Sequence, residues 1–479
     1  MGTHQPQDEL FSYRVNLEQR VRADHYLRRI QAALDLSFVR PEVERCYGVN
    51  GHVGTDPVIL VKMLLLMFLD DVASERELVG IIRERLDYLW FLGYGLDDKV
   101  PDHSVLSKAR ARWGGEVFCQ LFVRTVHQCV AAGLVDGQKL HLDSSLVRAD
   151  AARDSVIKAS PELAAALRAA YTKQEQKLEE GGADAAKTRY VSSTDPDASL
   201  SRGGGGSATQ LSYKHHRTVD NANGVITAVQ TTTGQAGDAA QLTPLIQQHE
   251  SHTNQKVTTA VGDKHYGSAE NYRYCQQRGI TSHLGVVQAN VKGKYPVSDF
   301  VYEPESDRYR CPAGHYLYYH NFKKDDLLVE YKIQEPGQCA GCALRAQCTS
   351  SRSGRTVTRA IFSELVEAGR RQAQSPAARR DLARRKHLME GSFADAANNH
   401  GFKRARWRGL WRQQIQDWLI AAIQNIRILV RKGWKFSGEG QAAVLFRLRQ
   451  LRCALGLMLR TPINEDVCCK IPTDQASPL

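Results

Sequence analysis

Three carboxylates in this sequence lie where they can share one site. Asp143 lies toward the end of a predicted strand, Asp263 directly follows another, and Glu390 lies mid-helix, in a predicted helix over residues 376–400. Three such groups repel one another unless divalent cations neutralise them. Two Mg²⁺ or Mn²⁺ ions would do so and would also promote in-line attack at a phosphate. Taken singly, each carboxylate also fits a helix cap or an exposed side chain; their order along the chain favours the metal site.

The elements predicted between residues 137 and 287 bring two of these carboxylates together. Hydrophobic patterning predicts three strands, a helix, a strand, a helix and a strand, over residues 137–148, 210–219, 225–233, 238–250, 256–262, 268–278 and 281–287. Asn223-Gly224 predicts a tight hairpin between the second and third strands. In this α/β order the first and fourth strands are neighbours at the sheet centre. Asp143 and Asp263 should therefore lie side by side, with the helix over 376–400 bringing Glu390 across.

Two residues near these carboxylates have alternative interpretations. His387 lies one turn before Glu390 and fits either a metal or phosphate contact or packing of its helix against the sheet. Asp238 opens a predicted helix, so a helix cap is favoured over a catalytic role.

The first 132 residues have a helical pattern. Residues 56–71 predict a buried helix, and Ser74 with Glu77 forms a capping box for the next one. A basic helix follows, on which Lys108 and Arg112 share a face while Arg110 points away. Such helices are compatible with helix-turn-helix DNA binding and also with many small bundles. The polar stretch over 150–207 predicts a helical excursion and a flexible loop.

Four clustered cysteines point to a second metal. Cys339 and Cys342 form a C-x-x-C pair, with Cys348 after it and Cys311 before it, and His315 is a spare candidate ligand. Four thiolates at this spacing suit a tetrahedral structural Zn²⁺. The alternative is four reduced thiols in a small β insertion. Eleven cysteines in 479 residues, an odd number, fit a reduced cytoplasmic protein rather than a disulfide framework.

The net charge is concentrated in one block. The chain carries a formal charge of +12, and residues 370–435 hold sixteen Lys or Arg against four acidic residues, which accounts for the whole excess. Aromatic residues are interleaved in this block (Phe402, Trp407, Trp411 and Trp418), which favours a nucleic-acid contact over a merely solvated helix face. A hydrophobic content of 42% excludes global disorder. The longest apolar run is too short to span a bilayer, so no membrane partner is expected.

Several segments together resemble a known family. The chain is similar to bacterial insertion-sequence transposases of the DDE class, in the branch with a cysteine-bearing insertion before the catalytic Glu. The matching segments lie at residues 56–62, 101–107, 213–220, 262–267, 389–393, 399–410 and 421–426. Two positions depart from the family pattern: Ala397 replaces a Lys seven residues after the Glu, and Lys386 replaces an Arg four residues before it.

The resemblance implies the fold and its division. It implies an RNase H-like catalytic core with a helical N-terminal domain and a β-rich, cysteine-containing insertion. The expected boundaries are a helical domain for DNA-end binding or dimerisation, the first part of the core, the insertion, the second part of the core with the basic block, and a tail, at residues 1–132, 133–290, 291–370, 371–435 and 436–479.

The resemblance also implies the chemistry. Asp143, Asp263 and Glu390 would hold two Mg²⁺ or Mn²⁺ ions for cleavage at transposon ends and strand transfer into target DNA. The expected partners are double-stranded DNA and a second copy of the chain, in the cytoplasm at the nucleoid. Candidate DNA contacts are Lys386, Lys403, Arg404, Arg406, Arg408, Lys108 and Arg112. The alternatives are a domesticated DNA-binding protein without cleavage activity and an RNase H-like nuclease without strand transfer.

Overall fold

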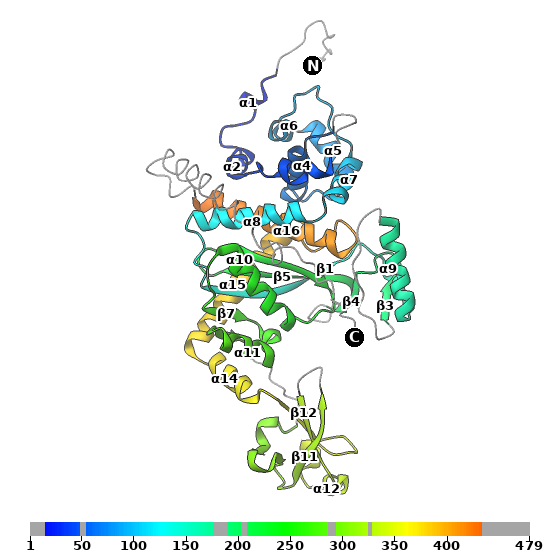
Figure 1. Ribbon diagram of the computed structural model, residues 1–479, viewed down its shortest axis with the longest axis vertical. Helices are drawn as coiled ribbons and strands as arrows, with labels where there is room; N and C mark the ends of the chain where they lie inside the picture. Colours follow the sequence, from blue (N-terminus) through cyan, green and yellow to red (C-terminus); the bar gives the residue numbers. More distant parts are fainter. Residues whose placement is uncertain are drawn as a thin grey trace, which may run out of the picture.

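The computed structural model describes residues 15–47, 54–175, 189–202, 208–285, 294–323 and 328–433 (Figure 1). The predicted tail at 436–479 lies outside these ranges. Three regions follow along the molecule in Figure 1: a helical domain, a sheet flanked by helices, and a small all-antiparallel sheet at the far end.

The helical domain is built on local signals that the sequence carries. Its helices are α1 (Leu17–Arg20), α2 (Tyr26–Ala33), α3 (Val39–Val43), α4 (Pro57–Leu69), α5 (Glu75–Glu84), α6 (Leu86–Leu92), α7 (His103–Trp113) and α8 (Glu116–Ala131). Asp56 caps α4 through the Val58 amide at 2.9 Å, and Pro57 takes the first helical position, where no amide donor is needed. The predicted capping box is confirmed: the Glu77 amide donates to Ser74 Oγ at 3.2 Å. No helix among the described residues is long and apolar enough to cross a membrane.

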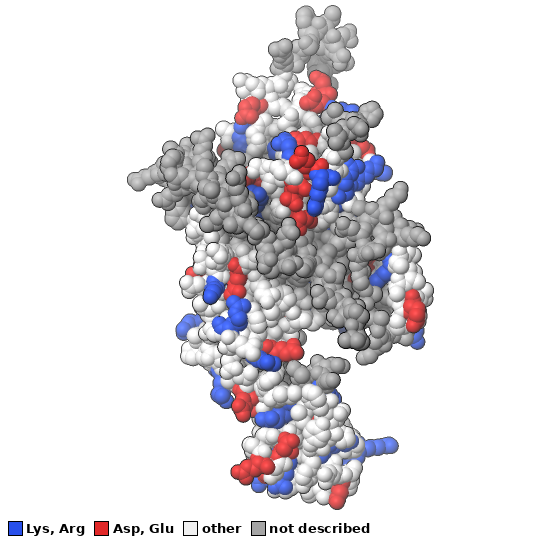
Figure 2. Space-filling view, viewed as in Figure 1, with Lys and Arg blue, Asp and Glu red and all other residues white. Residues whose placement is uncertain are grey.

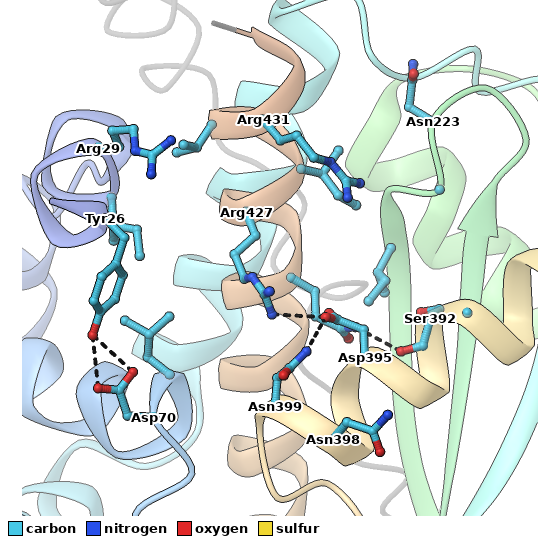
Figure 3. A pocket seen from close by; sticks show the side chains of 18 of the residues that line it. Tyr26, Arg29, Asp70, Asn223, Ser392, Asp395, Asn398, Asn399, Arg427 and Arg431 are labelled. Carbon is cyan, nitrogen blue, oxygen red and sulfur yellow. Dashed lines mark hydrogen bonds and ion pairs between the residues drawn. The ribbon is translucent and has the colours of Figure 1, made fainter. Parts of the chain in front are cut away.

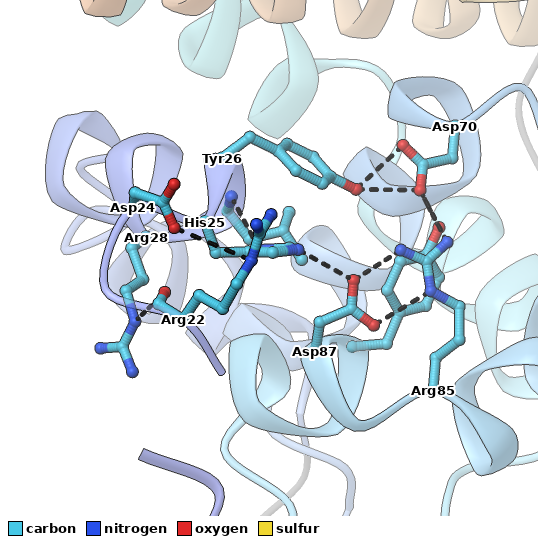
Figure 4. Close-up of polar contacts among 10 residues, drawn as sticks. Arg22, Asp24, His25, Tyr26, Arg28, Asp70, Arg85 and Asp87 are labelled. Atoms are coloured by element: carbon cyan, nitrogen blue, oxygen red, sulfur yellow. Dashed lines mark hydrogen bonds and ion pairs between the residues drawn. The ribbon is translucent and has the colours of Figure 1, made fainter. Parts of the chain in front are cut away.

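Ion pairs hold the first two helices onto this domain (Figure 4). Tyr26 on α2 donates to the Asp70 carboxylate at 2.9 Å, and Arg85 pairs with the same carboxylate at 2.9 Å. Arg85 also pairs with Asp87, which lies 3.5 Å from His25. The end of α4 is thereby tied to both α2 and α6.

The central sheet has the strand order β4-β5-β1-β7-β8. The sixth strand, β6, also pairs with β5, on the side away from β1. Its strands are β1 (Lys139–Arg148), β4 (Ser199–Arg202), β5 (Thr209–Asp220), β6 (Ile226–Thr233), β7 (Thr259–Gly262) and β8 (Thr281–Leu284). β1 is antiparallel to β5, β5 is antiparallel to β6, and β7 and β8 run parallel to β1. Three antiparallel strands followed by two parallel ones, joined through helices, define an RNase H-like core and confirm the predicted fold class.

Different helices cover the two faces of this sheet. Leu140 and Leu142 pack with α10 (Leu242–Thr253) and α11 (Ala269–Gln277) in one hydrophobic cluster. Because side chains alternate along a strand, the residues between them face the other side, toward α15 (Pro376–Asn399). There α16 (Leu410–Ile428) lies against β6 and α8, and apolar side chains of the helical domain, α16 and the sheet form one continuous core. The helical domain and the catalytic core are therefore packed as one unit.

The stretch over 150–207 is more structured than predicted. It contains the expected helix, α9 (Pro161–Glu175), but also three short strands that the sequence analysis missed: β2 (Val156–Ala159), β3 (Arg189–Ser192) and β4. β2 pairs with β3, and β4 extends the main sheet beside β5. Each of these strands has only four residues, which is too short for a clear alternation of apolar and polar side chains. Residues 176–188 and 203–207, including the glycine run, lie outside the described part.

The insertion is β-rich, as expected. Its five strands are β9 (Val301–Glu303), β10 (Arg308–Arg310), β11 (Tyr316–Lys323), β12 (Leu328–Ile333) and β13 (Thr356–Ala360), with short helices α12 (Pro336–Ala340) and α13 (Arg345–Cys348). Its buried core is small: Phe300, Tyr309, Leu317, Tyr331 and Val357. The next helix, α14 (Ser363–Ala373), falls within the range predicted for the insertion but packs against β8 and α11 of the core.

Candidate active site

Asp143 and Asp263 lie next to each other on one face of the sheet. In the parallel pair of β1 and β7, Leu140 is opposite Ala260 and His141 is opposite Val261. The same offset carries Asp143 to the position beside Asp263, which directly follows β7. The prediction that the first and fourth strands are neighbours is confirmed. The Asp143 side chain is 27% exposed, so it can be reached from solvent.

The carboxylate of Asp143 has a built-in counter-ion. Burial raises the pKa of Asp143, and the negative charge of Asp263 raises it further. Arg385 on α15 opposes both effects by donating to Asp143 Oδ2 at 2.8 Å, and the Ser144 amide donates to Oδ1 at 2.9 Å. The sequence analysis missed Arg385. Its only signal was helical spacing, because Arg385 lies one turn after the buried Asp381 and one turn before the buried Met389.

Glu390 lies on the neighbouring flank of α15. The face around Arg385, Met389 and Ser392 is directed to the sheet, whereas Glu390 is exposed, with 68% of its side chain accessible. Lys386 Nζ lies 4.0 Å from Glu390 Oε1. Among the residues that the structure describes, no three His, Cys, Asp or Glu side chains are grouped closely enough to hold a metal ion. The structure thus brings two of the three predicted ligands together and leaves the third beside them.

His387 does not pack its helix against the sheet. It is exposed and lines a cleft of about 1560 Å³ between α2, α15 and α16 (Figure 3). Arg427 and Asn399 hold Asp395 there, at 3.0 and 2.8 Å. Neither Asp143 nor Asp263 lines this cleft, so His387 faces a different cavity from the carboxylate pair.

Asp238 is not a side-chain helix cap, contrary to the prediction. Its carboxylate makes no capping hydrogen bond and instead lies 2.8 Å from Lys214 Nζ and 3.5 Å from His216 Nδ1. Near it, the buried hydroxyl of Tyr266 has no hydrogen-bond partner among the residues that the structure describes, and burial together with Asp238, Asp143 and Asp263 raises the Tyr266 pKa well above its ordinary value. A polar cluster therefore lies behind the carboxylate pair, on the α10 side of the sheet.

The predicted DNA contacts in the basic block separate into exposed and buried residues. Lys403 donates to Ser145 Oγ on β1 at 2.7 Å, which places it along the same strand as Asp143. Arg404 and Arg408 are 67% and 47% exposed and both lie near Asp150. Arg406, in contrast, is only 10% exposed and is paired with Asp71, so the structure does not offer it to a phosphate.

The aromatic residues of this block serve packing. Phe402 is fully buried, and Trp407 lies under the Arg110 guanidinium, 3.9 Å from its ring centre. In the helical domain, Lys108 and Arg112 are exposed while Arg110 is buried against Glu75, as the helical spacing predicted. On the face seen in Figure 2, basic and acidic side chains are mixed over this domain.

The four cysteines of the insertion line one small cavity. Cys311 follows β10, Cys339 lies on α12, Cys342 lies between α12 and α13, and Cys348 ends α13; together they surround a space of about 20 Å³, with His315 beside them. All four are free thiols. Burial raises the pKa of Cys348, and the other three thiols contribute to the rise. The predicted cluster therefore exists in space, although its sulfur atoms are not already grouped as metal ligands.

Comparison with known families places the chain in a class. Residues 15–112 match the family model described as a transposase domain (DUF772), and residues 310–430 match the transposase DDE domain. The second match includes Glu390 and the four cysteines. Together the two matches assign the chain to the DDE transposases of insertion sequences.

Other comparisons add little. No curated protein sequence matches the chain. Among solved structures, a cryo-EM structure of a piggyBac transposase synaptic complex with hairpin DNA aligns at 11% identity, covering 92% of this chain and 81% of that chain, with a TM-score of 0.34. A likeness this weak supports no assignment, so the RNase H-like fold rests on the strand order described above.

Proposed function

We propose that this transposase cleaves DNA at transposon ends and joins the freed 3′-OH to target DNA in a Mg²⁺-dependent reaction. The single observation that carries the proposal is the adjacency of Asp143 and Asp263 on one face of an RNase H-like sheet, beside the helix that bears Glu390. DNA is the proposed substrate because phosphate chemistry fits paired carboxylates, and because exposed Lys403 contacts Ser145 on the strand of Asp143 while exposed Arg404 and Arg408 lie beyond the end of that strand, near Asp150.

The carboxylates fit divalent cations by charge and type. Asp143 and Asp263 are like-charged oxygen donors next to each other, and only one of them has an arginine partner. Mg²⁺ or Mn²⁺, bound by these two residues and Glu390, would supply Lewis-acid stabilisation of the charge that develops at the phosphate. Arg385 keeps Asp143 ionised and oriented, and the α15 flank carrying Glu390 closes the site from above the sheet. No covalent intermediate with the protein is required.

The test uses nearly isosteric changes that remove the charge of each carboxylate. Asp143→Asn, Asp263→Asn and Glu390→Gln should each reduce cleavage and strand transfer by at least a thousandfold while duplex binding changes less than about threefold, since binding is carried by distributed phosphate contacts. Glu250→Gln, on α10 and paired with Arg278, is the matched control and should be active. Near-normal cleavage by any one variant would show that its residue is misassigned.

Two outcomes correspond to the alternative functions. A wild-type protein that binds end-containing duplex and never cuts it with Mg²⁺ or Mn²⁺ is a DNA-binding protein. One that cuts but fails to join pre-cleaved ends to target is a nuclease.

We further propose that the insertion holds a structural Zn²⁺ through Cys311, Cys339, Cys342 and Cys348. A closed zinc site forms together with its metal. Because the four cysteines already line one cavity, small side-chain rotations would bring their sulfur atoms to the ion. The insertion needs such support, because its buried core consists of five residues. Zinc binding contributes on the order of 10 kcal/mol in small zinc peptides.

Metal analysis tests this site directly. We expect about one zinc per chain in the wild type, lost when Cys339 and Cys342 are changed to Ser and retained in Cys46→Ser, a matched change in the helical domain. The double variant should become protease-sensitive within residues 294–360 first. Zinc-free protein with a resistant insertion and full activity would refute the site.

The remaining proposals concern assembly. We propose that Lys108 and Arg112 contact the transposon end and that the protein acts as a homodimer on DNA, in the cytoplasm at the nucleoid. In the full chain, replacing both residues by Ala should weaken end binding. Sedimentation with and without end DNA should show two chains per complex; one chain per complex would contradict the dimer.

A further inference from the structure

Arg217 is a fully buried arginine directly opposite the candidate active site. It lies on β5, where the antiparallel register places it beside Asp143 of β1, and none of its side chain is exposed. Among the described residues it forms no ion pair within 4.0 Å, although Asp417, Asp395 and Asp143 lie near enough to influence it. Burial lowers the Arg217 pKa to about 10, so the side chain still carries its charge at neutral pH. An isolated buried charge is costly, so its position calls for a reason.

The guanidinium makes three neutral hydrogen bonds that join separate elements. Nε donates to His215 Nε2 at 2.8 Å on its own strand. Nη1 donates to Ser392 Oγ on α15 at 2.8 Å and to Gln424 Oε1 on α16 at 3.0 Å. The Phe393 ring packs over the guanidinium, with its centre 4.4 Å from Cζ.

Hydrogen bonds from Gln424 on α16 reinforce this contact with α15. Gln424 Nε2 donates back to the Ser392 carbonyl at 2.9 Å and to Asp395 Oδ2 at 2.8 Å. Strand β5 and helix α16 therefore hold α15 over residues 392–395, directly after Glu390. Within the part of the chain that the structure describes, Nη2 of Arg217 is buried without a hydrogen-bond partner.

Glu390 itself makes no comparable tertiary contact with the described residues. It is exposed and pairs with Lys386 on the same helix, at 4.0 Å. The placement of its carboxylate relative to Asp143 thus depends on how α15 is held.

We propose that Arg217 is a positioning residue: Nε fixes its guanidinium on His215, and Nη1 holds Ser392 and Gln424, so that α15 is placed for Glu390 to join Asp143 and Asp263. The proposal rests on the proposed function, because it assumes a shared metal site. A mere charge effect makes a different prediction: lysine would then substitute for arginine. Positioning by the guanidinium does not allow this replacement, because two nitrogens held in one plane reach His215 on one side and Ser392 and Gln424 on the other, which a single ammonium nitrogen cannot do.

The experiment maps the metal site on the full-length protein with Fe²⁺ and ascorbate, whose hydroxyl radicals cut the backbone near the bound ion. We expect wild-type cuts near residues 143, 263 and 390. In Arg217→Lys the cuts near 143 and 263 should persist while those near 390 fall at least fivefold. DNA cleavage at saturating DNA should fall at least tenfold with a binding constant within about threefold of wild type.

Two further variants separate positioning from stability. Ser392→Ala removes one of the two acceptors of Arg217 Nη1 and should reproduce the pattern of Arg217→Lys more weakly. Arg110→Lys alters another buried arginine, which pairs with Glu75 and stacks on Trp407, and should lower the melting temperature without changing the cuts.

The possible results are distinguishable. Unchanged cuts near 390 and unchanged cleavage in Arg217→Lys would overturn the inference while the proposed function stands. Absence of cuts near both 143 and 263 in the wild type would overturn the proposed metal site, and the inference with it.

Discussion

Exposed arginines in the basic block give a quantitative test of DNA binding. Arg404 and Arg408 are 67% and 47% exposed, whereas Arg406, between them, is 10% exposed and paired with Asp71. We therefore expect Arg404 and Arg408 to reach phosphates and Arg406 to hold the segment on the helical domain. The perturbation is the double change Arg404→Ala and Arg408→Ala, compared with Arg406→Ala alone.

The magnitude follows from counter-ion release. Each phosphate contact contributes about 0.9 to the slope of log affinity against log salt, so losing two should flatten the slope by about 1.8. Between 50 and 200 mM salt this makes the drop in affinity smaller by about tenfold. Asp150 lies 3.6 Å from Arg404 and 3.4 Å from Arg408 and competes with phosphate for both. Asp150→Ala should accordingly strengthen binding at low salt.

The assay is fluorescence anisotropy with a labelled duplex at five or six salt concentrations, with catalysis blocked by chelation. Arg406→Ala should keep the wild-type slope and instead lower stability, because it leaves Asp71 unpaired. An unchanged slope in the double variant, or an equal flattening in Arg406→Ala, would refute the reasoning that exposure separates these arginines.

Two further predictions concern stability. Burial raises the pKa of Asp195 to about 6, so the folded protein binds this proton more tightly than the unfolded chain. This proton therefore contributes to the free energy of unfolding at low pH, and that contribution, up to about 3 kcal/mol, should be lost as pH rises from about 4 to above 6. Denaturant titration of Asp195→Asn should show a flatter dependence over that window, and an identical one would contradict the assignment. A Cβ on Gly369 would lie 2.2 Å from the Tyr272 ring, so Gly369→Ala should cost about 1–3 kcal/mol, whereas Gly391→Ala, with open space and a helical backbone, should stabilise by about 0.5–1 kcal/mol. Equal effects in the two unfolding curves would exclude this steric account.

Local sequence signals were sufficient for the elements that position the carboxylates. The predicted hairpin joins β5 to β6, but its loop is longer than a two-residue turn: the Asp220 amide donates to the Val225 carbonyl, and of the Asn223-Gly224 pair it is Gly224 that has a positive φ, 77°. The alternation of β1 and the apolar run of α4 depend on neighbours a few residues away. Strand order then followed from the order of elements, and with it the adjacency of Asp143 and Asp263.

Residues whose role depends on distant partners could not be read in the same way. Arg385 contacts Asp143, 242 residues away in sequence, and Arg217 contacts Ser392, 175 residues away. In the sequence each is one basic residue among many. Asp238 shows the converse case: its place before a helix favoured a cap, but a lysine on a neighbouring strand offered a stronger electrostatic partner. Local propensity gives way wherever a buried charge finds a tertiary partner.

The position of Glu390 beside the carboxylate pair has an electrostatic explanation with a measurable consequence. Asp143 and Asp263 bring two negative charges, which Arg385 and the buried Arg217 balance, so a third carboxylate would make the site negative and add repulsion. A divalent cation reverses this balance, and the gathering of Glu390 should accompany its binding. A DNA phosphate adds negative charge to the same place and should favour the cation further. By linkage, DNA must raise the affinity for the cation by the same factor by which the cation raises the affinity for DNA. Ca²⁺, chosen to avoid turnover, allows both factors to be measured by calorimetry and anisotropy, with Glu390→Gln as the comparison. In the wild type we expect the two affinity factors to match and to exceed one, and in Glu390→Gln we expect both to be smaller. Wild-type factors near one would place the cation away from the DNA and exclude this carboxylate pair as their common site.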